Sequence, residues 1–266
     1  MIVSLNGELL QVNAARIDPA DRGFLLGDGV FETIAVRRNA VRHLAAHLSR
    51  LRAGADLLEI PVPGSDQELA DKIGAVLAAN GLKDAVVRMT LTRGPAARGL
   101  LPSGTITPTL LIVAYPMPAP ADPARLIVAK STRRNEHSPL ARIKHTNYLD
   151  NVLARQEAAK AGADDAVLLN TAGNVAETSI ANVFILVDGY LLTPPVSDGA
   201  LPGVMRAEAI KLARAEERTV TSEMLMRAAE VFLTNALGVR PVTHIDGAAV
   251  GDGEPGLITQ LLATRL

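Results

Sequence analysis

A run of prolines near the middle of the chain constrains the fold more than any other feature. Residues 116–123 read Pro-Met-Pro-Ala-Pro-Ala-Asp-Pro, so four of these eight positions are proline. Proline has a fixed φ and no N–H, which excludes a helix interior or a central strand and favours a stiff, extended connector. We therefore predict a first domain at residues 1–115, a linker at 116–122 and a second domain at 123–266.

Strand and helix patterns are mixed on both sides of this linker, which predicts an α/β structure for each domain. Asn6-Gly7 between two short apolar runs indicates a β-hairpin at the start of the chain. Apolar residues recur at helical spacing over 44–58 and 66–79. Alternating or continuous apolar runs predict strands at 30–36, 85–92, 109–115, 125–129, 166–169, 182–187, 190–193 and 230–234.

Composition excludes several classes of function. Hydrophobic residues make up 48% of the 266 residues and charged residues 21%, which is typical of a folded globular protein. A net charge of −1 without blocks of like charge argues against nucleic acid or an anionic membrane as a partner. Cysteine is absent, which rules out disulfides and cysteine-based metal sites. No apolar run reaches the length of a membrane span and no signal peptide is recognisable, so we expect a cytoplasmic protein without a metal.

The stretch around Lys144 carries the first sign of chemistry. Lys144 lies in the sequence Ile-Lys-His-Thr-Asn-Tyr, and Glu177 follows after a helical pattern and a short strand. A lysine whose pKa is lowered by burial can form a Schiff base with a carbonyl compound. A carboxylate further on can hold the ring nitrogen of pyridoxal 5′-phosphate (PLP) protonated, which makes the ring an electron sink. Taken alone, Lys144 would be an ordinary surface lysine. The sequence leaves open the roles of the histidines near it, His137 and His145, for which a solvated loop position is the commoner case.

Two further motifs are compatible with a phosphate group. Leu201-Pro202-Gly203-Val204-Met205-Arg206 leads into a helical pattern, and a helix start offers N–H groups and the positive end of the dipole. Thr234-Asn235 follows a predicted strand. Most helix starts bind only water, so the motif alone is weak. A lysine, a carboxylate and a phosphate seat together are what PLP requires.

The order of these motifs resembles the class IV aminotransferase family, the fold-type IV PLP enzymes. The resemblance spans nearly the whole chain through GDGVFET, HLSRL, KHTNYLDNVLA, AETSIANVF, LPGVMR and FLTNALGVRPV. It implies an α/β fold of the α+β type, with a small N-terminal α/β domain and a larger C-terminal pseudo-barrel domain. It also implies PLP in the cleft between the domains, a small-molecule substrate and a homodimer.

The resemblance assigns roles to residues of this chain. Lys144 is similar to the lysine that forms the Schiff base and then moves the proton, and Glu177 to the carboxylate paired with the pyridine nitrogen. The remaining cofactor contacts that it implies are the phosphate ligands Arg50, Val204 and Met205 (through backbone N–H groups) and Thr234 (through its hydroxyl), together with Leu201 against the ring. Tyr148 falls in a matching motif and is predicted to contact the substrate.

Three details of these motifs resemble aminodeoxychorismate lyase. Thr33 in FET places a hydroxyl where that lyase has a functional threonine, and we predict that Thr33 is catalytic. Gly-Val-Met at 203–205 and Thr-Asn-Ala-Leu at 234–237 also resemble the lyase pattern. Arg98, and with it Arg93, is predicted to bind a substrate carboxylate, although solvated loop arginines are common.

Two alternatives remain at this point. An aminotransferase would use the same Lys144 and Glu177 to exchange an amino group between a branched-chain or D-amino acid, or an amine, and a 2-oxo acid. A non-catalytic PLP-binding protein would bind the cofactor without turnover. Free pyruvate and 4-aminobenzoate formed without an acceptor would identify the lyase, since the same PLP chemistry supports both reactions.

Overall fold

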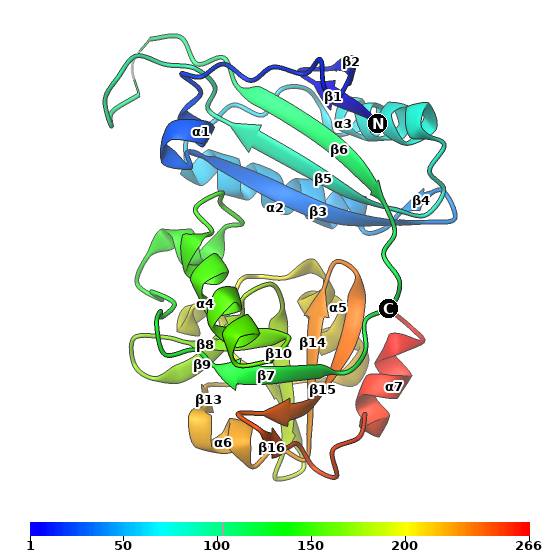
Figure 1. Ribbon diagram of the computed structural model, residues 1–266, viewed down its shortest axis with the longest axis vertical. Helices are drawn as coiled ribbons and strands as arrows, with labels where there is room; N and C mark the ends of the chain where they lie inside the picture. Colours follow the sequence, from blue (N-terminus) through cyan, green and yellow to red (C-terminus); the bar gives the residue numbers. More distant parts are fainter. Residues whose placement is uncertain (103) are drawn as a thin grey trace. The chain divides into compact units, whose positions relative to one another are not determined.

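The chain divides into two compact units in the computed structural model, which describes residues 1–102 and 104–266 (Figure 1). The first unit contains Met1–Ala119 and Ile143–Asn147, and the second contains Pro120–Arg142 and Tyr148–Leu266. The chain passes from one unit to the other within the proline-rich segment. The short segment around Lys144 belongs to the first unit although it lies well beyond that segment in sequence.

One antiparallel sheet forms the centre of the first unit, with the strand order β2-β1-β6-β5-β3-β4. The predicted hairpin is confirmed, because Asn6 and Gly7 have φ values of 54° and 92° and join the first two strands. The strands are β1 (Ile2–Leu5), β2 (Glu8–Gln11), β3 (Gly29–Arg37), β4 (Ala40–Val41), β5 (Ala85–Thr92) and β6 (Thr109–Pro116).

Helices α2 (Leu44–Leu57) and α3 (Asp66–Asn80) pack on this sheet, and a short helix α1 (Arg22–Leu26) precedes β3. Ser65 and Glu68 form a capping box that starts α3, because each side chain accepts a hydrogen bond from the other residue's backbone N–H. Alternation along β5 sends Val87 and Met89 into the core and leaves Arg88 half-buried on the other face.

The segment Ile143–Asn147 runs beside the start of β3. The Phe31 N–H donates to the Lys144 carbonyl at 2.8 Å, and the Thr146 N–H donates to the Gly29 carbonyl at 2.9 Å. These backbone bonds hold the Lys144 segment next to β3.

A second, larger sheet forms the second unit, with the order β12-β11-β10-β14-β15-β7-β8-β9-β13 and β16 paired to β15. Strands β9 and β10 are far apart in this order, yet the Thr178 N–H at the end of β9 donates to the Ala181 carbonyl just before β10. The sheet is therefore curled into a half-barrel. Its strands are β7 (Ala124–Val128), β8 (Asp165–Leu169), β9 (Asn174–Thr178), β10 (Asn182–Val187), β11 (Tyr190–Thr193), β12 (Glu216–Glu217), β13 (Val220–Thr221), β14 (Glu230–Asn235), β15 (Gly238–Ile245) and β16 (Ala248–Ala249).

The α-helices of this unit are α4 (Leu149–Lys160), α5 (Val204–Ala213), α6 (Ser222–Met226) and α7 (Leu257–Ala263). Three of these helices cover the outside of the curled sheet, while the short α6 packs its Leu225 against the interior cluster. Phe184 of β10 and Phe232 of β14 stack with ring centroids 4.8 Å apart and pack with Ala209 of α5 and Leu262 of α7. The neighbouring residues of both strands, Val183 and Leu233 among them, alternate into the interior of the half-barrel.

The predicted fold class is confirmed, since the chain is a mixed α/β structure with one smaller N-terminal sheet unit and one larger curled sheet unit. Over the part of the chain that the structure describes, no helix is both long enough and apolar enough to cross a membrane.

Candidate active site

Lys144 lies against an aromatic ring of the first unit. Its Nζ atom is 4.5 Å from the centroid of the Phe31 ring, and its side chain is half-buried. The sequence positions Phe31 for this contact because β3 pairs with the lysine segment at this point, through a bridge between Val30 and His145. The ring attracts the ammonium form of the lysine and so holds the side chain at this place, and a lysine amine can act as a nucleophile towards a carbonyl group.

Thr33 shares a face of the sheet with Phe31. The two residues are two positions apart on β3, so their side chains point to the same side. Arg88 lies directly opposite Thr33 in the register of β3 and β5, and its guanidinium carbon is 3.8 Å from the Phe31 ring centroid. The first unit therefore places an amine and a guanidinium at one aromatic ring, with Thr33 on the same face of the sheet.

Arg50 is a residue of α2, and its side chain contacts Glu32 of β3. Its Nε and Nη2 atoms donate to the two carboxylate oxygens of Glu32 at 2.8 and 2.7 Å, and the Nδ1 atom of His47 is 2.7 Å from the same carboxylate. Gly54, one helical turn after Arg50, packs against Ile143, since an added Cβ would lie 3.4 Å from that side chain. Arg50 is thus on the helix face that approaches the lysine segment.

The two arginines predicted to bind substrate differ in exposure. Arg93 is buried, and it donates to both oxygens of Asp28 and to the carbonyls of Leu58 and Glu59. Four N–H donors of Arg93 are thus used in hydrogen bonds within the first unit. Because Arg98 is exposed on the loop after β5, it is the better candidate to bind a substrate carboxylate.

Glu177 is the centre of the second unit's polar cluster. It is buried on β9, with Oε1 3.1 Å from the Arg134 Nε atom. The other oxygen accepts from the Leu201 N–H at 3.0 Å and from the Asn182 Nδ2 atom at 3.5 Å. The Arg134 cation stabilises the negative charge of Glu177. An ionised carboxylate is the form that can accept a hydrogen bond from a protonated pyridine.

A second cluster surrounds Asn182. Its Nδ2 atom donates to the Leu201 carbonyl at 2.9 Å, and it lies opposite Thr234 in the register of β10 and β14. A Cβ added to Gly203 would fall 2.0 Å from the Asn182 Oδ1 atom, so only glycine allows this approach. Helix α5 starts at Val204 without a side-chain cap, and Met205 follows in its first turn.

These groups fit a phosphate. The Thr234 hydroxyl is buried and has no hydrogen-bond partner among the residues that the structure describes. An unpaired buried hydroxyl is costly unless a ligand or water satisfies it. With the uncapped start of α5 beside it, the cluster offers backbone N–H groups, the positive end of a helix dipole and one hydroxyl. The second unit can therefore hold both the phosphate and the ring nitrogen of PLP.

Tyr148 directly precedes α4 and is half-buried. The two histidines, whose roles the sequence left open, differ in exposure. The His137 side chain is 82% exposed, whereas His145 is buried and accepts a hydrogen bond at Nδ1 from the Asn147 N–H at 3.1 Å. Pairing of this segment with β3 buries His145, and no local pattern indicated that pairing.

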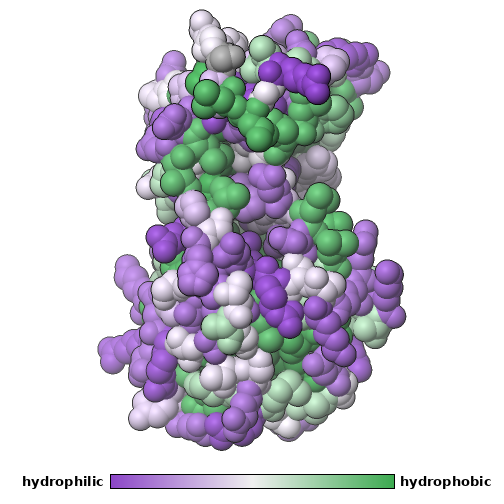
Figure 2. Space-filling view, turned by 90° about the vertical axis from the view of Figure 1, so that its left-hand side faces the viewer, coloured by the Kyte–Doolittle hydropathy of each residue, from purple (hydrophilic) through white to green (hydrophobic). Residues whose placement is uncertain are grey.

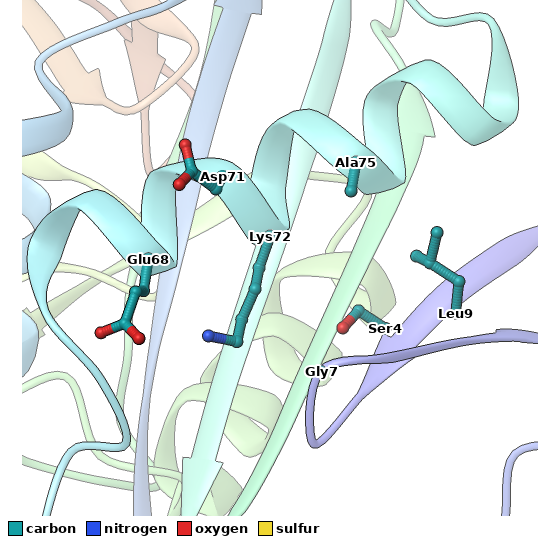
Figure 3. A pocket seen from close by; sticks show the side chains of 7 residues that line it. All are labelled: Ser4, Gly7, Leu9, Glu68, Asp71, Lys72 and Ala75. Carbon is teal, nitrogen blue, oxygen red and sulfur yellow. The ribbon is translucent and has the colours of Figure 1, made fainter.

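A further concavity lies on the first unit, where an open pocket of about 300 Å³ separates the β1–β2 hairpin from α3 (Figure 3). Its lining includes Ser4, Leu9, Glu68 and Lys72. Glu68 is engaged in the capping box of α3, where hydrogen bonds from the Ser65 backbone and side chain lower the pKa of its carboxyl. The pocket contains none of the residues predicted for the site.

Three polar residues of these clusters were not assigned from sequence. Arg88 was detectable as the one charge in the apolar run of β5, but its position opposite Thr33 depends on strand register. Asn182 lies in a recognised motif without a clear role. Arg134 lies in an irregular segment, and only the fold brings it to Glu177.

The sequence is similar to those of known proteins. Residues 29–245 match the family described as amino-transferase class IV. A putative branched-chain-amino-acid aminotransferase of Methanocaldococcus jannaschii is 37% identical over 273 residues, which cover 100% of this chain and 95% of that protein. A D-alanine aminotransferase of Bacillus licheniformis is 31% identical over 272 residues, with 100% and 96% covered.

Solved structures of such proteins are also similar to this chain. A branched-chain amino acid aminotransferase complexed with N-(5′-phosphopyridoxyl)-L-glutamate has a TM-score of 0.91 at 28% identity, over 99% of this chain and 92% of that one. A putative 4-amino-4-deoxychorismate lyase of Legionella pneumophila has a TM-score of 0.86 at 32% identity, over 93% of both chains. The fold is thus similar to that of proteins described as aminotransferases and of one described as a lyase.

Proposed function

This chain belongs to the class IV aminotransferase family of PLP-dependent enzymes, as its motifs predict, and from that premise we propose that it is a 4-amino-4-deoxychorismate lyase. The observation that carries the proposal is the position of Thr33 beside Arg88 on the Phe31–Lys144 face of the first unit. A hydroxyl on the same face of the sheet as the lysine suits a reaction in which a leaving group must be protonated.

Under this proposal, the groups described above would hold the cofactor. Bound PLP supplies an electron sink for the negative charge left when a proton is removed next to the substrate nitrogen. Glu177, oriented by Arg134 and the Leu201 N–H, would bind the pyridine nitrogen. The phosphate would be bound by the N–H groups of Val204 and Met205 and by the Thr234 hydroxyl, and, as the family motifs imply, by Arg50. Leu201 would pack against the ring.

The side chains of the first unit perform the proton transfers. The Lys144 amine removes the C4 proton of 4-amino-4-deoxychorismate, the bond from C3 to the enolpyruvyl oxygen breaks, and the ring becomes aromatic. The products are 4-aminobenzoate and pyruvate. Thr33 donates a proton to the departing enolpyruvyl group, directly or through one water. Arg98 binds a substrate carboxylate, with Arg88 and Tyr148 as further contacts.

We expect Thr33→Val to lower kcat for the lyase reaction about 100-fold, because the hydroxyl is removed while shape and volume are nearly kept. Purified enzyme is incubated with 4-amino-4-deoxychorismate without any oxo acid, and 4-aminobenzoate is measured. Thr33→Ser retains the hydroxyl and is expected to stay within about tenfold of wild type. A Thr33→Val enzyme as fast as wild type would remove Thr33 from the mechanism, and no product from wild type would reject the lyase.

The second candidate is an aminotransferase, which the similarity to the two curated relatives supports. The residues of the cofactor site keep their roles. In this reaction Lys144 would move the proton without expulsion of a leaving group, and the amino group would be transferred to a 2-oxo acid. Branched-chain and D-amino acids are therefore screened with a 2-oxo acid acceptor. Acceptor-dependent turnover without 4-aminobenzoate formation would assign this reaction, and bound cofactor without any turnover would indicate a non-catalytic protein.

A homodimer is the expected assembly, and an exposed apolar patch on the first unit supports it. Phe24 and Leu25 of α1 are 78% and 58% exposed, and Leu100 and Leu101 are 82% and 85% exposed. Arg22 links α1 to the loop, since it donates to the carbonyls of Gly99 and Leu100. Figure 2, which faces the side on which α1 lies, shows hydrophobic residues gathered on this unit. Clustered exposed apolar residues mark interaction sites.

Wild type is expected to elute with twice the chain mass of 28.0 kDa in size-exclusion chromatography with light scattering. Phe24→Asp is expected to weaken the dimer about 30-fold or more, as for a central interface residue. Leu257→Asp is the matched control, because Leu257 is 81% exposed but lies on α7 of the other unit. A monomeric wild type would contradict the proposed assembly, and dissociation by both variants would contradict the assignment to this patch.

A further inference from the structure

Glu32 is a charged residue inside the apolar layer of the first unit. Its side chain is 0% exposed, it lies opposite Met89 in the sheet register, and its neighbours on the same face of β3, Val30 and Ile34, are core residues. A buried carboxylate is costly unless hydrogen bonds and opposite charges compensate for the lost hydration. An apolar side chain would pack at this position at lower cost. The presence of a carboxylate therefore calls for an explanation beyond packing.

Three donors meet this carboxylate. Arg50 binds both oxygens through Nε and Nη2, and the His47 Nδ1 atom donates to Oε2. Burial alone would raise the pKa of Glu32, but the hydrogen bonds and charges of Arg50 and His47 outweigh it and hold the pKa below its usual range. Since an ionised carboxylate only accepts hydrogen bonds, the proton of the imidazole is on Nδ1.

The geometry of this contact orients Arg50. Two parallel N–H···O bonds define the plane of a guanidinium as well as its position, which a single contact would not do. His47 and Arg50 are three residues apart on α2 and therefore share one helix face. His47 donates a hydrogen bond to the Glu32 carboxylate, and that carboxylate accepts two hydrogen bonds from Arg50. The orientation of the arginine is therefore fixed by a buried residue of the core.

We propose that Glu32 and His47 are positioning residues that aim the Arg50 guanidinium at the cofactor phosphate. The proposal rests on the role of Arg50 stated under the proposed function. It deepens that role, because affinity for the phosphate then depends on a buried carboxylate that does not touch the cofactor. The bidentate pair restricts the side-chain motion of Arg50 before binding, so less ordering is left for the binding step.

The test compares two ligands that differ only by the phosphate. Glu32→Gln keeps the shape of the side chain but turns one acceptor oxygen into an NH₂ group that faces the donors of Arg50 or His47. Apo-enzyme is titrated with PLP and, separately, with pyridoxal, and binding is followed by visible absorbance. We expect the Kd for PLP to rise about tenfold or more, the factor for one lost charge-assisted hydrogen bond, while the Kd for pyridoxal changes less than about threefold.

A matched control is available on the same helix. Arg52 of α2 pairs with Asp66 at 2.8 Å, but this carboxylate is 57% exposed. Asp66→Asn removes an arginine's carboxylate partner at the surface, and the ratio of the two Kd values is expected to stay as in wild type. If Glu32→Gln raises both Kd values equally, the role of Glu32 is only structural and the proposal is wrong.

A double-mutant cycle separates this proposal from the role of Arg50 itself. If Glu32 acts through Arg50, the Glu32→Gln/Arg50→Gln pair has the same PLP-to-pyridoxal ratio as Arg50→Gln alone. An unchanged ratio in Arg50→Gln would reject the phosphate role of Arg50. A changed ratio in Arg50→Gln with an unchanged ratio in Glu32→Gln would reject only the positioning role. If Glu32→Gln does not fold, two variants of His47 replace it. His47→Asn keeps an N–H donor and is expected to keep the wild-type ratio of the Kd values for PLP and pyridoxal. His47→Ala removes the donor and is expected to change that ratio.

Discussion

Lys144→Ala is expected to lower turnover about 1,000-fold or more, in the lyase and the aminotransferase assay alike. The amine is the only group of the Phe31 cluster that can both bind a carbonyl carbon covalently and carry a proton at neutral pH. Alanine leaves the Phe31 N–H bond to the residue-144 carbonyl in place, because that contact uses only the backbone. The fold should therefore persist while the chemistry is lost.

Two measurements check this result. Turnover is measured with 4-amino-4-deoxychorismate and with amino acid plus oxo acid, and the visible absorbance band of the PLP-loaded protein is recorded. The band is expected to vanish in Lys144→Ala and to remain in Lys160→Ala, which removes an exposed lysine at the end of α4. Turnover of Lys144→Ala within about tenfold of wild type would mean that another group performs the proton transfer.

Asp28→Ala is expected to have the largest effect on stability, a loss of about 3–5 kcal/mol in the free energy of unfolding. The Asp28 carboxylate binds Arg22 at 2.7 Å and Arg93 at 2.8 Å, and these two arginines are only 5% and 7% exposed. Removing the carboxylate leaves two buried cations facing each other without a counter-charge. Denaturant unfolding at neutral pH measures the loss, and Asp66→Ala, which breaks the more exposed pair with Arg52, is expected to cost about 1 kcal/mol or less.

The same pair predicts a dependence on pH. Burial on its own would raise the pKa of Asp28, but hydrogen bonds from Arg93 and Arg22 outweigh it and hold the pKa below the ordinary value of 3.8. A lowered pKa means that the carboxylate stabilises the fold fully above pH 3.8 and progressively less as the pH falls through the folded-state pKa. The stability difference between wild type and Asp28→Ala should therefore shrink below that pH. A difference of less than about 1 kcal/mol at neutral pH would show that the arginines find other partners.

Local patterns determined most of the elements and the family. The Asn6-Gly7 turn, the alternation over Ala85–Thr92 and the helical spacing after Leu44 are properties of neighbouring residues, and each element formed where its pattern lies. Lys144 and Glu177 were identified because their motifs keep a fixed order along the chain. Such information is present in the sequence before any tertiary contact is made.

Only the tertiary structure decided how the polar side chains are paired. Arg93 lies in a segment predicted as a loop, and only the fold shows that it is buried and paired with Asp28. Arg88 meets Thr33, and Arg134 meets Glu177, through strand register and an irregular segment respectively. The physical reason is the separation along the chain over which each interaction acts. Hydrophobic periodicity and turn propensity depend on residues that are close in sequence. A buried charge instead pairs with any group that the folded backbone brings within about 3 Å, however distant that group is in sequence.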